Sequence, residues 1–485
     1  TESLLLSLVG GALGVLVALW GVDALVALAP DALPRANEVA LDARVLLFSA
    51  GLTLATGVGF GLLPALSASR PDLHDGLRDG ARGASATRGR LKRALVVGEL
   101  ALSLVLLVGT GLMLRSFLAL RAVDPGLEPA HVLTLHAALP APKGPPGDED
   151  RARWVAWFAR ATARLRQLPG VRFAAAADYL PFDGNNSRYS LDIEGRTPAS
   201  PGELRHVETR QVTAGYFEAL GVRVVSGRSF SDGDDSATAP GVVVINQAMA
   251  RRYFADSDPI GRRVRLHAGK RQLSTIVGVV ADVRGYGLDQ PALPELYVPY
   301  AQAAESSSMA LVVRTDGDAA ALVGAARAAL GEVDAGQPIF DVLPLRELVA
   351  QSLAQRYFAL VLMLVFAGVA LLLAAVGIYG VMSYTVAQRT QEIGIRVALG
   401  APSGSVLKMV VADGMRLVAL GLVLGVGGAL ALTRLLSSML YGVSATDAPT
   451  FAAIAALLAL VALTATVIPA RRATRVDPML ALRAD

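Results

Sequence analysis

The sequence predicts a helical membrane protein with six transmembrane helices and an inserted α+β domain on the outer side of the membrane. Its composition is 53% hydrophobic and only 18% charged, where a soluble protein typically carries about 25% charged residues. The apolar residues gather in charge-poor runs near both ends of the chain, and the stretch between them has the composition of an ordinary soluble domain. This pattern disfavours a wholly water-soluble enzyme.

Six stretches are long and apolar enough to be spans. Crossing a bilayer takes about 20 mostly apolar residues, because no water is available inside to bond to an exposed backbone. The clearest stretch has no charged residue between Arg356 and Arg389. The six predicted spans are residues 4–28, 44–67, 94–118, 357–388, 415–440 and 449–470.

The basic residues of the short loops predict the orientation of these spans. Residues 70–93 hold seven Lys and Arg residues, and the loop after the fourth span and the C-terminal tail are also basic. Loops rich in Lys and Arg stay in the cytoplasm. The loops 29–43 and 435–448 hold one basic residue and none, respectively. Alternating the spans therefore places the long stretch between the third and fourth spans outside the cytoplasm.

An internal repeat supports a division into modules. Residues 64–78 align without gaps with residues 469–483, and each segment follows a predicted span. We therefore interpret the N-terminal region as the back part of a unit whose fuller copy is C-terminal. Because Thr1 lies inside an apolar run, we expect a preceding part to be missing. The predicted divisions are 1–80 with two spans, a basic cytoplasmic linker 81–93, a transmembrane helix 94–120, an outer domain 121–355, and a second membrane module 356–485 with three spans.

Pairs of glycines four residues apart predict close helix contacts within the membrane. Two such glycines lie on one helical face and let a neighbouring helix approach. The alternative, that glycine is simply common in membrane helices, is equally compatible with any single pair. The pairs are Gly10 with Gly14, Gly57 with Gly61, and Gly421 with Gly425.

The outer stretch alternates β-rich runs with amphipathic helices, which predicts an α+β domain in two lobes. A helix at 148–168 places Trp154 and Phe158 on its apolar face, and a second helix is expected at 318–333. We interpret Trp154, Trp157 and Phe158 as core rather than as a binding site. The predicted strands are residues 131–137, 203–213, 241–245, 262–267, 274–283, 296–299 and 310–314.

The sequence predicts no catalytic, cofactor-binding or metal site. It has no P-loop and no H-E-x-x-H motif, and without cysteine it cannot form a zinc finger, an iron–sulfur cluster or a thiol nucleophile. The acidic run Asp232, Asp234 and Asp235 lacks the glycine and glutamate of a calcium loop, so we interpret it as a solvated turn. A net charge of +4 without a basic stripe argues against nucleic-acid binding.

The most informative segment is Q-R-T-Q-E-I-G-I-R-V-A-L-G-A, residues 388–401, which continues the fourth span into the cytoplasm. Glu392 precedes Arg396 by four residues, an order that stabilises a helix by about 0.2–0.5 kcal/mol. We expect the helix to end at 400–402 and Ser403 to cap the next one. Its isoleucines have two explanations that the residues leave equally open. The helix folds back on its own protein, or it docks into a partner.

These motifs resemble those of the FtsX-like, MacB-type permeases of ABC transporters. Residues 388–401 and the closing P-A-R-R-A-T-R-V-D-P-M-L-A-L-R are similar to the permease signatures. Segments of the outer stretch resemble the MacB-type periplasmic core domain, and the repeat resembles the duplicated orphan permease branch, of which this chain would be the C-terminal part. The core-domain segments are 215–222, 226–230, 244–254, 258–263 and 276–284.

The resemblance implies a permease subunit without its own ATPase site, in a bacterial inner membrane, with a large periplasmic domain. A separate cytoplasmic ATPase subunit would bind ATP and drive the periplasmic domain to export or extract a substrate. The implied alternative is a non-transporting mechanotransmission or signalling protein. Further implied partners are a periplasmic adaptor, and the missing first module or a second copy. By position, the ATPase-coupling element would comprise Arg389, Gln391, Glu392, Ile393, Gly394, Arg396, Ala398, Leu399 and Gly400.

Overall fold

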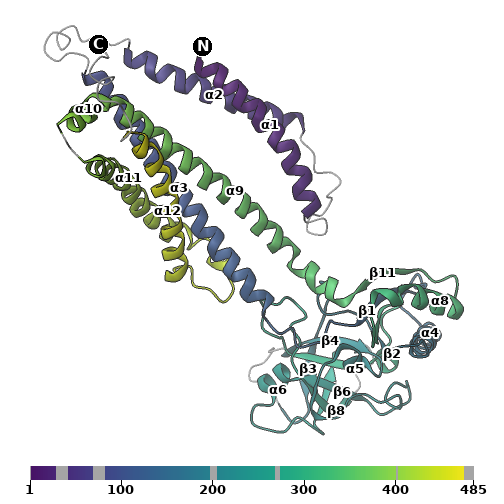
Figure 1. Cartoon of the computed structure of the whole chain (residues 1–485). Helices are drawn as coiled ribbons and strands as arrows, with labels where there is room; N and C mark the ends of the chain where they lie inside the picture. The colour runs from purple at the N-terminus through teal and green to yellow at the C-terminus, as the bar shows by residue number, and fades with distance from the viewer. Residues whose placement is uncertain are drawn as a thin grey trace. The chain divides into compact units, whose positions relative to one another are not determined.

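The structure, a computed structural model, describes residues 2–28, 42–68, 82–196, 205–267, 273–399 and 402–473 (Figure 1). The chain divides into two compact units. One is helical and combines Thr1–Leu120 with Ala354–Asp485; the other, Arg121–Leu353, is inserted between them and contains the strands. The predicted class, a helical membrane protein with an inserted α+β domain, is confirmed at this level.

The helical unit is built from long apolar helices with short connections. The helix α3 begins at Arg82, so residues 82–93 of the predicted linker are helical and continuous with the following span. The helices are α1 Glu2–Leu28, α2 Ala43–Ala68, α3 Arg82–Arg121, α9 Leu345–Gln388, α10 Thr390–Ala398, α11 Ser403–Leu432, the 3₁₀ turn η3 Ser437–Met439, and α12 Ala448–Ala473.

Within the described residues, five helices are long and apolar enough to cross a bilayer. The remaining predicted span, 44–67, corresponds to α2, in which the apolar stretch found is the shorter Ala43–Gly59. The end of the predicted span 415–440 is wrong. After α11 the amides of Leu435 and Leu436 bond three residues back, to Leu432 and Thr433, and the helix ends although the sequence stays apolar. The five are Leu4–Ala24, Lys92–Arg121, Leu345–Gln388, Gly404–Leu432 and Ala448–Arg472.

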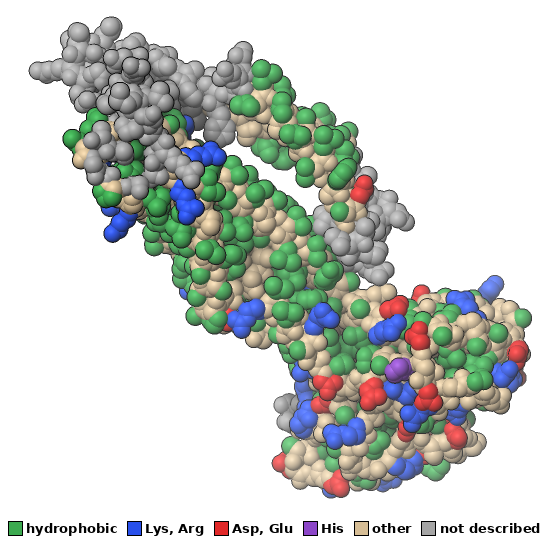
Figure 2. Space-filling model, viewed as in Figure 1, with side chains coloured by type: hydrophobic (Ala, Val, Ile, Leu, Met, Phe, Trp, Pro, Cys, Tyr) green, Lys and Arg blue, Asp and Glu red, His purple; other side chains and the backbone are tan. Residues whose placement is uncertain are grey.

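Four helices, α3, α9, α11 and α12, share one apolar core. On α9 the buried side chains recur every four or seven residues, at Ala367, Ala374, Ile378 and Met382, as expected for one face of a helix. Large apolar side chains such as Phe366, 59% exposed, cover the outer flank of the bundle, where charged side chains are sparse (Figure 2). Lipid is the environment that suits such a surface.

The glycine pair of α11 lies at a helix contact, as predicted. A Cβ atom added to Gly421 would lie 2.7 Å from Cβ of Leu100, and one added to Gly425 would lie 2.9 Å from Cβ of Leu104. Both leucines belong to α3 and are fully buried. The absence of side chains at these two positions therefore allows α11 to approach α3.

The prediction for Gly10 and Gly14 is wrong, because no atom lies within 4 Å of a Cβ added at either position. The neighbouring Gly11 makes the contact instead, against Thr53 of α2. Spacing identifies a common face of a helix but not which face meets a neighbour. Gly57 does lie at the contact of α1 with α2, and its predicted partner Gly61 is outside the residues whose surroundings are described.

The internal repeat lies mostly outside the described residues, which exclude 69–81 and 474–485. The equivalence of the two copies therefore stays a prediction.

The inserted unit is an α+β domain around one mixed sheet of eleven strands. Their order is β11-β1-β10-β2-β4-β3-β7-β8-β6-β9, with β5 pairing with β8, and β4 pairs parallel with β9. The strands are β1 Val132–Ala138, β2 Val171–Ala177, β3 Ser187–Ile193, β4 Arg205–Val212, β5 Val224–Gly227, β6 Val242–Asn246, β7 Arg263–Leu266, β8 Leu273–Val280, β9 Glu295–Pro299, β10 Ser308–Thr315 and β11 Ile339–Pro344. The helices are α4 Asp148–Arg166, α5 Tyr216–Leu220, α6 Gln247–Tyr253, α7 Tyr300–Ala303, the 3₁₀ turn η2 Ala320–Leu322 and α8 Val323–Val333.

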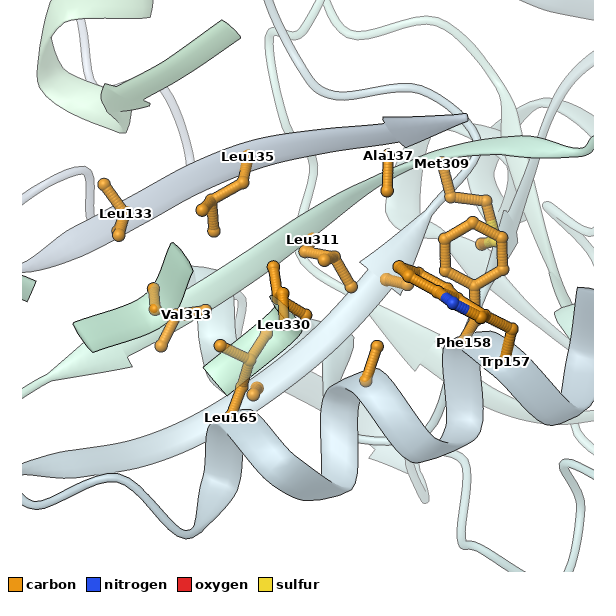
Figure 3. Packing of buried hydrophobic residues seen from close by; sticks show 14 of the residues in the cluster. Leu133, Leu135, Ala137, Trp157, Phe158, Leu165, Met309, Leu311, Val313 and Leu330 are labelled. Carbon is orange, nitrogen blue, oxygen red and sulfur yellow. The ribbon is translucent and has the colours of Figure 1, made fainter. Parts of the chain in front are cut away.

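Two separate apolar clusters lie against this sheet. In the first, Trp157 and Phe158 of α4 point toward Met309 and the strands β1 and β10 (Figure 3). Trp154, Trp157 and Phe158 are at most 3% exposed, so their prediction as core is confirmed. The second cluster packs Met249 of α6 against β6, β8 and β9. Both clusters share one continuous sheet within one compact unit, so the division into two lobes stays a prediction.

Candidate coupling site

The helix α10 is separate from α9 and is not a continuation of it. The helix is interrupted at Arg389, whose amide donates to the carbonyl oxygens of both Thr385 (3.2 Å) and Val386 (3.1 Å). The carbonyl of Arg389 then accepts the first bond of the new helix, from the amide of Ile393 at 2.9 Å. The segment therefore follows the fourth span as a short helix of its own, and the predicted end of that span at 388 agrees with the end of α9.

An ion pair connects this break to α11. Nη1 of Arg389 lies 2.9 Å from Oδ2 of Asp413, and both side chains are about one-third exposed. Oδ1 of the same carboxylate lies 3.3 Å from Nη1 of Arg416, one turn along α11. Arg389 therefore both ends α9 and connects it to α11.

One face of α10 packs against its own protein. Ile393 is 2% exposed and packs on Val406 of α11, with Val386 and Met409 beside them. Gly394 is also buried. The explanation in which the helix folds back on its own protein is therefore correct for this face.

The predicted pair of Glu392 and Arg396 forms. Oε1 of Glu392 lies 2.7 Å from Nη2 of Arg396, with both side chains about half exposed. Nη1 of Arg396 also donates to Sδ of Met409 at 2.9 Å, which adds a second connection to α11.

The opposite face of α10 is apolar and exposed. Ile395 is 45% exposed, and Leu399, four residues later, is 82% exposed. Because residues four apart lie on one side of a helix, these two side chains form an apolar pair that points away from the contact of Ile393. This exposed pair is the feature of α10 on which a coupling role would depend.

The predicted coupling residues divide between these faces. Gln391 and Ala398 lie in α10, and Gly400 is outside the described residues. Ser403 is the first residue of α11, and the preceding Pro402 takes the cap position, so the predicted serine cap is wrong. Sequence reasoning missed Ile395, although its spacing to Leu399 was a usable signal. It also missed Asp413, for which no local signal exists.

The acidic run of the inserted domain is used for internal contacts. Asp234 binds Arg228 through both carboxylate oxygens, at 2.6 and 3.0 Å, and accepts from the amide and hydroxyl of Ser231. The Arg228 guanidinium lowers the pKa of Asp234. Asp235 accepts from the amide of Ala301. In the part of the chain that the structure describes, no group of three His, Asp or Glu residues is placed to hold a metal ion.

Two protein families match the chain in separate segments. Residues 94–329 match the MacB-like periplasmic core domain, and residues 364–478 match the FtsX-like permease C-terminal domain. The chain is an ABC transporter permease of the MacB and FtsX type. Neither matched domain of this permease is an ATPase. The resemblance that the sequence motifs predicted is confirmed at this level, and its placement in the duplicated branch stays a prediction.

Curated relatives of the permease share about a quarter of its residues. It is 27% identical over 278 residues to the uncharacterized ABC transporter permease YknZ of Bacillus subtilis, covering 56% of this chain and 68% of that protein. It is 28% identical over 337 residues to the macrolide export ATP-binding/permease protein MacB of Chromobacterium violaceum, and the match covers 64% of this chain and 49% of that protein. It is 24% identical over 410 residues to the pyoverdine export ATP-binding/permease protein PvdT of Pseudomonas syringae. That match covers 81% of this chain and 56% of that protein.

The permease thus spans about half the length of these ATP-binding/permease relatives. Among solved structures, the periplasmic region of MacB from Actinobacillus actinomycetemcomitans is similar, at 17% identity and a TM-score of 0.31 over 46% of this chain and 92% of that one.

Proposed function

We propose that this permease couples ATP hydrolysis by a separate cytoplasmic ATPase subunit to a conformational change of its inserted domain, for export or extraction of a substrate. The observation that carries the proposal is the exposed apolar pair Ile395 and Leu399 on a helix whose other face is fixed to the bundle. A partner that buries this pair would gain the apolar anchor on which protein interfaces commonly depend.

Force applied to α10 has a direct route into the membrane helices. Arg389 is bonded both to the last turn of α9 and to Asp413 of α11, so a shift of α10 would be passed to these two helices. The helix α9 has 44 residues, about 66 Å at 1.5 Å per residue, and follows β11 of the inserted domain directly in the chain. A long helix that continues from the inserted domain in the chain suits such a relay.

The partner chemistry follows from the same face. Ile395 and Leu399 would insert into an apolar groove of the ATPase, and the half-exposed pair of Glu392 and Arg396 would lie at the rim, where charges steer association. The remaining proposed coupling residues, including Arg389 and the buried Ile393, would position the helix. ATP itself would be bound by the partner.

Photo-crosslinking at Leu399 tests the proposal. A photoreactive amino acid at this position of the full-length protein in native membranes should crosslink to a nucleotide-binding protein, and Leu399→Asp should abolish stimulation of its ATPase activity. Val225, 44% exposed, is the control for labelling at an exposed apolar position of the inserted domain. Absence of an ATPase among the products at 399, or equal labelling from 225, contradicts the proposal.

The membrane orientation has its own test. Because the chain has no cysteine, single-cysteine variants at the exposed Ser226 and Ser405 can be labelled with an impermeant maleimide in intact cells. For a bacterial inner-membrane protein with a periplasmic inserted domain, only the variant at 226 should react once the outer membrane is permeabilised. Reaction at 405 would contradict the proposed orientation.

Transport and signalling are distinguished in vesicles that contain the permease and its ATPase. Movement of a substrate upon ATP addition supports export or extraction. A change in the inserted domain without movement of a substrate would assign the protein to mechanotransmission. A periplasmic adaptor and a second copy of the permease module are the further partners we propose.

A further inference from the structure

A basic cavity of about 310 Å³ lies at the end of the bundle where α10 begins. It is lined by Arg93 from α3, Arg389 after α9, and Asp413 and Arg416 from α11. Three guanidinium groups face one carboxylate, which leaves a net charge of +2. Lys and Arg side chains are visible around this end of the bundle in Figure 2.

The cavity has an apolar floor. Met382 and Leu417 line it beside the arginines. Beneath these two side chains, the packing against Val96, Ile378 and Gly414 leaves no room for an acyl chain. An amphipathic ligand would therefore place its charged group in the cavity and its apolar chains against the exposed apolar flank of the bundle.

The cavity lies where the apolar spans end, which is the level at which a bilayer surface is expected. Arg93 is the second residue of the span Lys92–Arg121, and Arg389 follows the last residue of α9. Beyond Asp413 and Arg416, the rest of α11 runs to Leu432 without a charged residue. Its 16 residues, 417–432, correspond to about 24 Å of helix, close to the apolar thickness of a bilayer.

The arginines keep donors free for a ligand. Arg389 and Arg416 each use one terminal nitrogen on Asp413, whereas a guanidinium carries five N–H donors. Arg93 has no ion-pair partner among the described residues, and its side chain is exposed. Arginine binds phosphate oxygens with two parallel hydrogen bonds, so three converging arginines suit a phosphate group.

We propose that this cavity binds the phosphate of an anionic phospholipid, whose acyl chains lie against the exposed apolar flank of the bundle. The Lys and Arg counts place this end of the bundle in the cytoplasm, so the lipid would come from the cytoplasmic leaflet. The lipid would bridge α3, α9 and α11 at the break from which α10 begins. The proposal does not depend on the coupling role of α10, because it concerns lipid binding without ATPase or nucleotide.

Lipid titration of the purified full-length protein in detergent, followed by native mass spectrometry, tests the proposal. Dioleoyl phosphatidylglycerol should bind at least tenfold more tightly than dioleoyl phosphatidylcholine. Arg93→Gln and Arg416→Gln should each weaken phosphatidylglycerol binding about fivefold, the effect of one basic residue at a membrane surface. Arg434→Gln is the matched control, because Arg434 is exposed at the other end of α11, and it should change nothing.

Two further arms separate a lipid from a free phosphate. Leu417→Asn removes no charge but makes the floor of the cavity polar, and it should weaken phosphatidylglycerol binding severalfold at unchanged thermal stability. Inorganic phosphate at 10 mM should not displace the lipid. Displacement by phosphate, an unaffected Leu417→Asn variant, equal binding of phosphatidylcholine, or an equal effect of Arg434→Gln would each overturn the proposal.

Discussion

The inserted domain buries an ion pair at its centre, whereas the helix bundle keeps its ion pairs at helix ends. Arg210 of β4 lies 2.9 Å from Glu295 of β9, and both side chains are only 4% exposed. Tyr297 also donates to Glu295. In the bundle, Arg389 pairs with Asp413 near one end of the helices, and Arg115 pairs with Asp447 just before α12. A sheet can supply the extra hydrogen bonds that a buried charge needs, and lipid cannot.

The two units also differ in how their elements approach one another. The inserted domain fills its core with large side chains such as Trp154 and Phe158, both nearly inaccessible to solvent. The bundle brings α11 onto α3 through Gly421 and Gly425. Water drives apolar side chains together in the first case. In lipid this hydrophobic driving force is absent, so close packing between helices must hold the bundle together.

Breaking the buried ion pair of Arg210 and Glu295 should give the largest loss of stability. Arg210→Met leaves Glu295 buried without its partner and should lower the free energy of unfolding of the inserted domain by about 3–5 kcal/mol. In a Trp20→Phe background the remaining tryptophans, Trp154 and Trp157, both lie in this domain, so their fluorescence during denaturant unfolding of the full-length protein reports on it.

The control is Arg263→Met. Arg263 pairs with Glu194 on the surface, where the side chains are 52% and 46% exposed, so the loss should stay below about 1 kcal/mol. The double variant Arg210→Met/Glu295→Leu should recover most of the stability. Equal losses for the buried and the exposed pair would contradict the proposed difference between the two units.

Filling a glycine contact should destabilise the bundle by an intermediate amount. Gly421→Leu places a side chain where Cβ alone would lie 2.7 Å from Leu100, and overpacking of this kind costs about 1–3 kcal/mol. Thermal unfolding in detergent measures the change. Gly427→Leu on the same helix meets no atom within 4 Å and should be neutral. If both variants behave alike, close approach does not hold α3 and α11 together.

The inserted domain should lose stability as the pH rises toward neutrality. Burial raises the pKa of Asp178 to about 7, although Arg210 and the amides of Gln211 and Tyr179 favour its charged form. Because the folded-state pKa lies above that of the unfolded chain, this contribution is full below about pH 4 and is lost as the pH passes through 7. Between pH 6 and 7 the loss should be about 1 kcal/mol.

Comparing the pH dependence of unfolding for the native protein and for Asp178→Asn measures this contribution. The substitution should remove the slope between pH 6 and 7, because the amide cannot titrate. An unchanged slope would assign the pH dependence to another group of the domain.

The smallest effect is expected for a hydrogen bond between helices. The hydroxyl of Ser103 on α3 donates to the carbonyl of Ala370 on α9 at 3.1 Å. Such bonds contribute about 0.6 kcal/mol in membrane proteins, so Ser103→Ala should lower bundle stability by that amount in the same detergent assay. Thr464→Ala is the control, because this exposed hydroxyl bonds only to its own helix, at Val461. A loss of 2 kcal/mol or more would show that polar contacts, and not close fit, dominate the bundle.

Periodicity and composition predicted part of this structure and missed part for identifiable reasons. The apolar face of α4 and the core position of Trp157 followed from helical spacing. The strand β2 was missed, because its run Ala174 to Ala177 has no strand-forming side chains and is held by pairing with β10. The end of α11 was missed because the chain stays apolar after Leu432.

The candidate coupling site was also predictable from the sequence only in part. The motif around Glu392 and the pairing with Arg396 could be predicted, because both residues lie on one short helix. The contacts of Arg389 with Asp413 and of Ile393 with Val406 could not be predicted. They join residues whose spacing follows no helical or strand repeat, and only the packing of α9, α10 and α11 brings them together.

By itself, the sequence determined that the chain enters the membrane, where most of its spans lie, and that a soluble α+β domain is inserted between them. These properties depend on the hydropathy and the charge summed over stretches of the sequence. They do not depend on which residues lie close together in space. The tertiary structure alone decided which face of each helix in the membrane unit meets a neighbour. Whether Gly11 or Gly10 meets α2, and whether Ile393 or Ile395 faces outward, depends on the rotation of each helix against its neighbours.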